Sequence, residues 1–306
     1  MVVLGAGGFL GKALLADPPP MPVRAVARSI PGEATSSRRG ISWHAADLTA
    51  RGSLDNIVQR GDVVVNLAFA ADETELVNLA LAANIVGACV RAGAARLVHC
   101  STAVVVGGTR EKRVTECTVC APQTQYQRTK LRVERLMLDA AADRLDVGVL
   151  RPTAVVGAGG QNLVSLARAL EGGNPIANYL RACLFGRRPM NLVPVQTVAA
   201  ALVHLAVRPA LLAGSIYIVT SDDPTNNFQC VEARLRRGLR LPPRSIPPFP
   251  LPRPVLSWLL RVLHRSESDA ERTYDGTKLR RAGFTSTHAL ADAIMQFAAA
   301  LHNDAR

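Results

Sequence analysis

The sequence has no run of about 18 uninterrupted apolar residues, and no basic segment followed by an apolar stretch at its start. It therefore predicts neither a transmembrane helix nor a secretory signal. Among its six cysteines only Cys117 and Cys120 have metal or redox spacing, and no second pair or histidine cluster follows them. This pattern favours free thiols in a reducing cytoplasm and no metal site.

Aromatic residues are also scarce, at 4% of the chain, although the net charge is +12. The basic residues are almost all arginine, with only four lysines, and they are dispersed rather than clustered. Nucleic-acid binding needs a basic patch or aromatic stacking platforms, and neither is evident. The charge is better explained by an anionic small substrate, and no nucleic-acid partner is expected.

What the sequence does contain is a β-α alternation through its first half. Short β-rich runs, which do not alternate apolar with polar residues, are typical of parallel strands buried on both faces. They lie at 1–4, 23–28, 41–45, 62–69, 95–102 and 146–152, with helical patterns at about 74–92 and 124–144. We expect an α/β fold, a Rossmann-type doubly wound parallel sheet with a smaller C-terminal substrate lobe.

The second half has a looser rhythm, with a helix expected at 198–207 and a strand at 215–220. A proline-dense stretch at 241–254 precedes the apolar run 255–265, and a last helical pattern covers 288–302. We assign 1–157 to the dinucleotide-binding domain, to which 195–221 returns. The lobe is assigned mainly to 158–194 and 222–306.

The opening "MVVLGAGGFLG" places a glycine loop between a strand and a helix. Gly5, Gly8 and Gly11 give the spacing used by short-chain dehydrogenase/reductases. Glycines allow a tight turn and let a pyrophosphate approach the helix N-terminus, where free N–H groups favour anions. The loop, with Phe9 and Leu10, is a candidate cofactor site. Its first strand is short, and a few residues are expected to be missing from its start.

Arg28 follows the second expected strand, in "AVARS", where no acid occurs before Glu33. A carboxylate at this place accepts the ribose hydroxyls of NAD, whereas an arginine suits the 2′-phosphate of NADP. We therefore expect NADP to be favoured over NAD.

Tyr126 and Lys130, in "YQRTK", lie four residues apart and share one helix face. A free tyrosine titrates near pH 10, but a nearby ammonium and an oxidised nicotinamide favour the phenolate and lower its pKa. Ser101 and Thr102 end the strand before this helix and supply hydroxyls that hold a substrate oxygen beside the tyrosine. This set predicts acid–base chemistry coupled to hydride transfer.

With these motifs the chain resembles the extended short-chain dehydrogenase/reductases of the NAD-dependent epimerase/dehydratase family of sugar-nucleotide enzymes. The resemblance also covers "VVNLAFAA", "LRPTAVVGAG", "NLVPVQTVAAAL" and "YDGTKLRRAGF". It implies Thr102, Tyr126 and Lys130 as catalytic residues, with Lys130 also holding the nicotinamide ribose. It further implies contacts to the cofactor, which would come from Asp47 and Leu48 beside the adenine, Leu67 and Ala68 in the cleft, Asn78, Ser101, Pro152 and Thr153.

Substrate contacts carry over less fully. Asn162 and Leu163 match a segment that meets the nucleotide diphosphate, and Arg265 lies where a phosphate-binding arginine is frequent. The chain departs from the family at Ala154, Met190 and Thr197, which replace an asparagine, an arginine and an aspartate. These departures leave the nucleotide and the sugar open.

Three functions remain. The first is NAD(P)-dependent hydride transfer at C4 of a nucleoside-diphosphate sugar, as a 4-keto-sugar reductase or a 4-epimerase. The second, suggested by the proline-rich and apolar run after 241, is an NADP-dependent reductase of an apolar ketone, similar to hydroxysteroid dehydrogenases or dihydroflavonol reductases. The third is a non-catalytic NADP-binding regulator, which the presence of both Tyr126 and Lys130 disfavours. The resemblance also implies a homodimer, paired through the helices at 74–92 and 124–144.

Overall fold

The computed structural model describes residues 1–30, 32, 40–141, 144–244, 246–249 and 271–304. A seven-stranded sheet forms its centre, in the order β10-β7-β5-β4-β1-β2-β3, and every pair of neighbours in it is parallel. This order, in which the chain winds outward in both directions from β1, confirms the Rossmann-type doubly wound fold. Its strands are β1 (Val2–Leu4), β2 (Val23–Ala27), β3 (Ile41–Ala45), β4 (Val63–Asn66), β5 (Arg96–Cys100), β7 (Asp146–Pro152) and β10 (Ile216–Val219).

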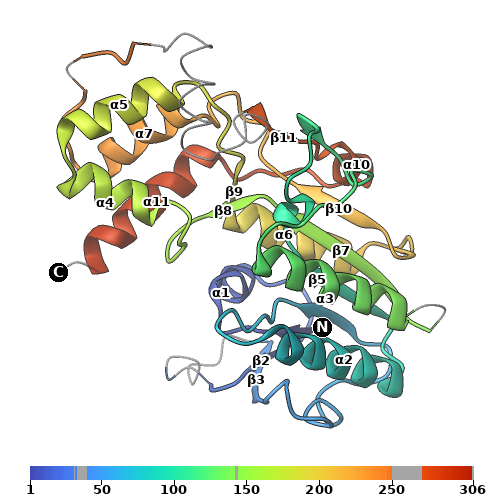
Figure 1. The fold of residues 1–306 in the computed structure, drawn as a ribbon. Helices are drawn as coiled ribbons and strands as arrows, with labels where there is room; N and C mark the ends of the chain where they lie inside the picture. Colours follow the sequence, from blue (N-terminus) through green and yellow to red (C-terminus); the bar gives the residue numbers. More distant parts are fainter. Residues whose placement is uncertain (31, 33–39, 142–143, 245, 250–270, 305–306) are drawn as a thin grey trace.

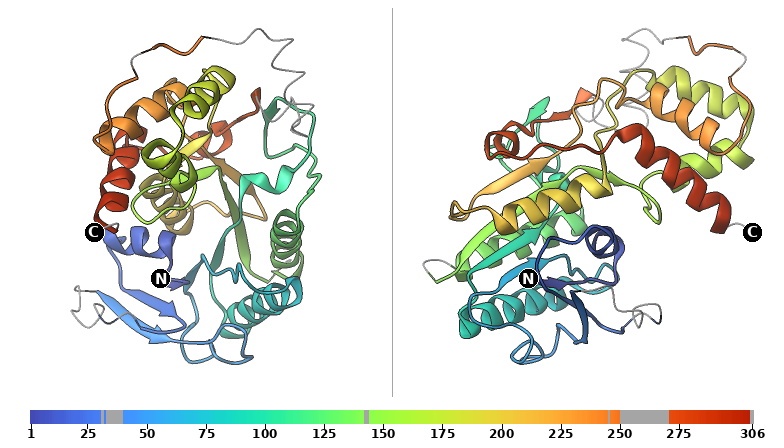
Figure 2. Two further views of the ribbon diagram at one scale, coloured as in Figure 1. Left: turned by 60° about the vertical axis from the view of Figure 1, so that its left-hand side comes forward. Right: turned by 180° about the vertical axis from the view of Figure 1, so that it is seen from behind.

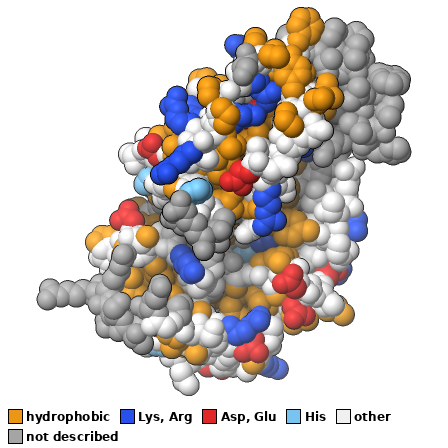
Figure 3. Space-filling model, turned by 90° about the vertical axis from the view of Figure 1, so that its left-hand side faces the viewer, with side chains coloured by type: hydrophobic (Ala, Val, Ile, Leu, Met, Phe, Trp, Pro, Cys, Tyr) orange, Lys and Arg blue, Asp and Glu red, His pale blue; other side chains and the backbone are white. Residues whose placement is uncertain are grey.

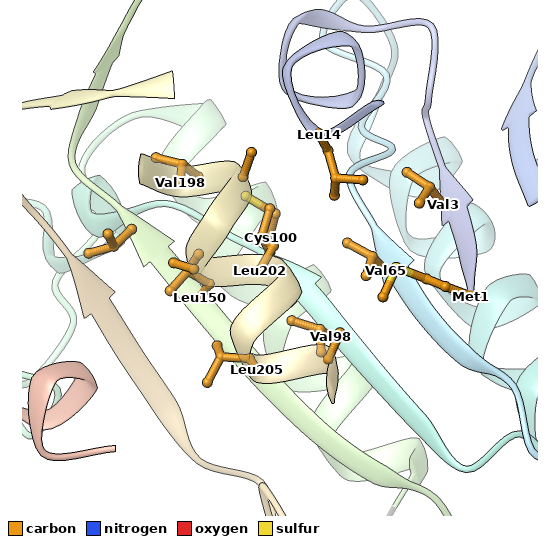
Figure 4. Close-up of a cluster of buried hydrophobic side chains, with 14 of the residues drawn as sticks. Met1, Val3, Leu14, Val65, Val98, Cys100, Leu150, Val198, Leu202 and Leu205 are labelled. Atoms are coloured by element: carbon orange, nitrogen blue, oxygen red, sulfur yellow. The ribbon is translucent and has the colours of Figure 1, made fainter. Parts of the chain in front are cut away.

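The strands are apolar on both faces because helices cover both sides of the sheet. Successive residues of β1 alternate: Val3 packs in one core, and Val2 and Leu4 pack in the other. The first core includes residues of α1 (Phe9–Ala16) and α6 (Val195–Val207), as Figure 4 shows for Leu14, Val198 and Leu202. The second core includes residues of α2 (Glu75–Ala92) and α3 (Gln125–Ala141), which lie side by side in Figure 1.

The short first strand still occupies the centre of the sheet. Residues Val2 to Leu4 pair with β2 on one side and with β4 on the other. The amino group of Met1 donates a hydrogen bond to the carbonyl of Pro22, at 3.0 Å. Three residues are enough here because both neighbouring strands supply partners for their backbone groups.

The lobe lies at one end of the sheet and has a core of its own (Figures 1 and 2). It contains α4 (Val164–Gly172), α5 (Pro175–Phe185), α7 (Phe228–Gly238) and α11 (Leu290–Asp304), with the two-stranded pair β8 (Ala154–Val156) and β9 (Leu192–Pro194). Leu163, Leu235 and Ile294 are among the buried residues that hold these elements together.

Part of the segment that is assigned mainly to the lobe packs against the sheet. Leu279 of α10 (Thr277–Arg281) and the following Phe284 belong to the α1/α6 core of the sheet. Just before them, β11 (Thr273–Tyr274) pairs with β6 (Arg113–Val114). A short 3-10 helix, η2 (Ala103–Val106), follows β5. The segment 273–284 therefore packs against the sheet domain, and the remaining division into domains stays a prediction.

One helix of the described residues, α2, is long and apolar enough to cross a membrane, by length and composition only. No transmembrane helix was expected, because the sequence has no uninterrupted run of about 18 apolar residues. Buried residues such as Ile85 and Cys89 pack into the second core of the sheet. Core helices pass the same test, so α2 is explained by its place in the fold.

Candidate functional site

The glycine loop joins β1 to α1 through contacts that side chains would prevent. Gly5 has a φ of +78°, and a Cβ on it would lie 3.0 Å from the backbone nitrogen of Ala68. A Cβ on Gly11 would lie 2.4 Å from the carbonyl oxygen of Ala6. Gly8 forms the N-cap of α1, and it offers no side chain to bind the first amides of the helix. The loop therefore keeps the N-terminus of α1 available for an anion.

Beside this loop lies a cleft of about 410 Å³ at the carboxyl ends of β1, β2, β3 and β4. It brings together seven of the residues expected to bind the cofactor: Gly5, Gly8, Arg28, Asp47, Leu48, Leu67 and Ala68. Phe69 and Thr49 also line it and were not expected. Phe9 instead packs over the 157–160 loop, where a Cβ on Gly160 would lie 3.1 Å from its ring, and Leu10 packs against the first core.

Arg28 and Asp47 place charges of opposite sign on this cleft. The Asp47 carboxylate accepts hydrogen bonds from the Thr49 hydroxyl, at 2.7 Å, and from the Thr49 N–H, at 3.0 Å. These bonds, together with the positive charge of Arg28, hold the pKa of Asp47 below its ordinary value. The cleft thus offers both a guanidinium and an ionised carboxylate to a bound nucleoside.

The loop after β4 is fixed at both ends by buried asparagines. The Asn66 side-chain oxygen accepts from the Ala68 N–H at 3.0 Å. The Asn78 amide group bonds both backbone groups of Ala70, at 3.0 and 2.9 Å. Asn78 is only 1% exposed, so its place in the structure is that of an anchor for this loop.

Thr102 and Tyr126 lie close together just beyond the carboxyl end of β5, and Lys130 follows Tyr126 one turn later in α3. The Thr102 side chain caps η2, and it lies close enough to the Tyr126 phenol to lower its pKa. Tyr126 begins the first turn of α3 and is 45% exposed, whereas Lys130, one turn later, is 7% exposed. Ser101 is 4% exposed, and its hydroxyl has no hydrogen-bond partner within the described part of the chain.

The pKa of Tyr126 in this group is raised, whereas the sequence analysis expected a nearby ammonium and an oxidised nicotinamide to lower it. Burial and the neighbouring Cys100 thiol raise the pKa of Tyr126, and the hydrogen bond from Thr102 lowers it by a smaller amount. Burial also lowers the pKa of Lys130, against the opposing effects of Cys100 and Glu134. Glu134 is itself paired with Arg151 in a buried ion pair, with Nε to Oε2 at 3.0 Å. The surroundings of Tyr126 thus favour the neutral phenol over the phenolate.

Phe69 is the site residue that the sequence analysis missed. The Lys130 ammonium lies 4.2 Å from the centre of its ring, a cation–π contact. The Tyr126 ring meets it edge-on, with centroids 5.6 Å apart and planes at 89°. The sequence feature that could have identified Phe69 is its position at the end of the apolar run 62–69, which was interpreted only as a strand.

Pro152 and Thr153 lie where β7 ends beside β10. The Thr153 N–H donates to the Val219 carbonyl at 3.1 Å, and its hydroxyl donates to the same oxygen at 3.4 Å. Thr153 is 6% exposed. In the structure it ties the two strands together.

Of the three residues expected to bind the substrate, the structure describes Asn162 and Leu163. The Asn162 side chain donates to the Val155 carbonyl at 2.7 Å, and Leu163 is 1% exposed in the lobe core. Arg265 lies outside the described residues. Asn162 is thus occupied in holding its own loop, and Leu163 has only its backbone to offer a ligand.

A larger cleft, of about 710 Å³, lies between the end of β10 and the start of α7. Its walls come from three separate segments of the chain, which include Arg187, Asn191, Asp222, Asn227 and Tyr274. None of the expected site residues that the structure describes lies in it. On the face shown in Figure 3, arginines and lysines are spread among hydrophobic side chains, as the sequence suggested.

Metal ligation finds no support in the part of the chain that the structure describes. No group of three or more His, Cys, Asp or Glu side chains is placed there to hold an ion. Cys117 is exposed and Cys120 is half-buried, and both are free thiols.

Comparisons with known proteins identify the family and the fold of the chain. The model of the NAD-dependent epimerase/dehydratase family matches residues 1–212. No curated protein matches the chain. Among solved structures, WbmH of Bordetella bronchiseptica in complex with NAD+ is 16% identical, with a TM-score of 0.72 and coverage of 98% of this chain and 97% of that one.

Two further structures are similar over nearly the full length. UDP-glucose 4-epimerase of Thermotoga maritima, with UDP-glucose, is 15% identical with a TM-score of 0.70, covering 100% of this chain and 99% of that one. MoeE5 in complex with UDP-glucose and NAD is 22% identical with a TM-score of 0.67, at the same coverage of both chains. At these identities the structures support the Rossmann-type fold. The family match over more than half of the chain establishes that this protein is a member of the NAD-dependent epimerase/dehydratase family, an NAD(P)-binding enzyme of the extended short-chain dehydrogenase/reductase type.

Proposed function

We propose that the protein transfers hydride at C4 of a nucleoside-diphosphate hexose, as a 4-keto-sugar reductase or a 4-epimerase. The observation that carries this proposal is the proximity of Thr102 and Tyr126, with the buried Lys130 one turn later in the same helix. Phe69, which lines the glycine-loop cleft, contacts both Tyr126 and Lys130. Hydroxyl, phenol and ammonium are the groups that a carbonyl–alcohol interconversion needs.

The residues that line the smaller cleft fit an NAD(P) cofactor. The glycine loop leaves room for a pyrophosphate at the uncapped N-terminus of α1. Arg28 and Asp47 lie at the ends of β2 and β3, where the adenosine half of the cofactor would bind. When bound, the nicotinamide supplies or accepts the hydride. We assign NADP as the favoured cofactor because the Arg28 guanidinium suits a 2′-phosphate.

The chain's own residues would handle the proton. Tyr126 donates a proton to the C4 oxygen when a ketone is reduced and removes it when an alcohol is oxidised. Thr102 holds the same oxygen by a hydrogen bond. Lys130 binds the nicotinamide ribose hydroxyls, and its positive charge favours the phenolate form of Tyr126. Such a charge is needed because the surroundings of Tyr126 raise its pKa.

A UDP-sugar is the substrate class that we infer, since structures of similar fold hold UDP-glucose. The larger cleft beside α7 would take its nucleotide, as it joins the lobe to the carboxyl edge of β10. We further propose a homodimer through α2 and α3, which pack together on one face of the sheet, and a cytoplasmic location.

Replacing Tyr126 by Phe tests the chemistry. We expect turnover to fall by about 10³-fold, since the residue acts as general acid and base, and NAD(P) binding to be unchanged. The control is Tyr179→Phe, which removes a phenol bonded to the Pro247 carbonyl in the lobe. Deuterium at C4 of UDP-glucose, or on the transferable position of NADPH, should give a primary isotope effect or labelled C4 in the product. Full activity of Tyr126→Phe, or label found away from C4, would contradict the proposal.

A further inference from the structure

Phe69 separates the cofactor cleft from the two residues that are expected to meet the reacting end of the cofactor. The residue lines the cleft, whereas Tyr126 and Lys130, which its ring contacts, do not. The aromatic ring thus borders both the cleft and these two side chains. We expect a ligand that extends from the glycine loop toward Lys130 to come against this ring.

The ring also occupies the approach to the Lys130 ammonium. The distance from Nζ to the ring centre is 4.2 Å, which is contact distance. Lys130 is 7% exposed, so little of its surface is open. A ribose hydroxyl that bonds Nζ needs a distance of about 3 Å, and one that comes from the side of the ring would overlap the space that the ring fills.

Hydrogen bonds hold the backbone on both sides of Phe69. We therefore expect its side chain, and not the loop, to move. The Asn66 and Asn78 side chains bond the backbones of Ala68 and Ala70, directly before and after Phe69. Phe69 itself is half-buried and borders the open cleft. A rotation about its side-chain torsions would free Lys130 without moving the loop.

We propose that Phe69 is a positioning residue that shields Lys130 and Tyr126 until the nicotinamide half of the cofactor displaces its ring. The adenosine half binds at the other end of the cleft, near Arg28 and Asp47, and does not require this movement. The inference rests on the proposed function in one respect, the assignment of Lys130 as the ligand of the nicotinamide ribose.

The electrostatics agree with this arrangement. The phenol pKa is raised, although an ammonium lies one helical turn away, and the ring contacts both groups. Displacement of the ring would let Lys130 act on the phenolate directly. Cofactor binding and activation of Tyr126 would then be the same event.

The test compares whole and half cofactors on single variants by calorimetry. In Phe69→Ala, NADP and NAD should bind about three- to tenfold more tightly than in the wild type, because no cation–π contact has to be broken. AMP and 2′-phospho-AMP, which lack the nicotinamide half, should bind equally to both proteins. Phe69→Leu keeps bulk without a π face, and an intermediate gain is expected.

The matched control is Phe185→Ala. Phe185 also packs against a second ring, Phe228 at 5.2 Å, and beneath a cation, Arg188 at 5.4 Å, but it lies in the lobe. NAD(P) affinity should not change in this variant. Thermal unfolding of each variant shows whether it is folded.

The outcomes separate this inference from the proposed function. If the wild type binds NAD(P) and Phe69→Ala binds it equally or more weakly, the ring is a platform or plays no part, and the inference is wrong. A parallel gain for AMP would also overturn it, since the effect would not be confined to the nicotinamide half. If neither protein binds NAD(P), both the inference and the proposed function fail.

Discussion

The two clefts of this molecule differ in how they are built. The 410 Å³ cleft beside α1 collects residues that directly follow strands of one parallel sheet, and most were expected from short motifs. The 710 Å³ cleft beside α7 is assembled from three segments that lie far apart in the chain, and motif matching did not find it. A site at strand ends inherits its geometry from the sheet, whereas a site in a lobe depends on how separate segments pack.

The comparison predicts that small changes at the glycine loop act strongly on the first cleft. Gly11→Ala places a Cβ 2.4 Å from the Ala6 carbonyl oxygen, and backbone has to shift. We expect the free energy of unfolding to fall by about 3 kcal/mol, which is the size of effect that overpacking of a tightly packed site produces. Urea unfolding measures it, and NAD(P) affinity should fall together with stability. If Gly11→Ala changes neither the free energy of unfolding nor the NAD(P) affinity, the loop is not tightly packed.

Charge reversal should separate the functions of the two clefts. Arg28→Asp is expected to weaken NADP binding by about 2 kcal/mol, roughly thirtyfold, because a bidentate phosphate contact is replaced by repulsion. NAD affinity should rise relative to NADP, and UDP-glucose affinity should stay the same. Arg187→Asp, in the larger cleft, should weaken UDP-glucose binding and leave the cofactor preference unchanged. If both variants alter the same ligand, the two clefts are not separate sites.

Acid should lower the stability of the protein by protonating His99, a buried residue of β5. Burial and the charge of Lys130 lower the pKa of His99 to about 3, below its ordinary value of 6.5. The unfolded chain therefore binds the extra proton between these values, and stability is lost as the pH falls from 6.5 toward 3. The expected cost is about 1.4 kcal/mol for each pH unit in this window. Unfolding of His99→Gln should show a smaller pH dependence than the wild type. The exposed His288→Gln is the control, and equal slopes in all three proteins would refute the assignment.

The smallest expected effect lies in the lobe and is the counterpart of Gly11→Ala. Gly172 is the last residue of α4, and a Cβ on it meets nothing within 4 Å. Gly172→Ala should stabilise the protein by about 0.5–1 kcal/mol, because alanine favours the helix and restricts the unfolded chain. Urea unfolding of both variants side by side measures the contrast. Destabilisation by Gly172→Ala would mean that the lobe is packed as tightly as the loop.

Several parts of the site were predictable because each depends on a short stretch of chain. The strand–glycine–helix unit places Gly5 and Gly8, and the ends of adjacent parallel strands place Arg28 and Asp47 beside them. The helical spacing of Tyr126 and Lys130 puts both on one face of α3. Asn162 and Leu163 carry a matching motif as well, but their side chains turned out to bond a local carbonyl and to fill the lobe core.

The sequence by itself determined the parallel doubly wound sheet and the glycine loop, and it predicted Thr102, Tyr126 and Lys130 as the acid–base residues. These features follow from local periodicity, from the backbone freedom of glycine and from the carboxyl edge that parallel strands share. Tertiary structure alone decided that Phe69 covers Lys130, that burial raises the pKa of Tyr126, and that segment 273–284 packs on the sheet. Each of these depends on which side chains meet across elements distant in the chain, and on how much water the meeting excludes.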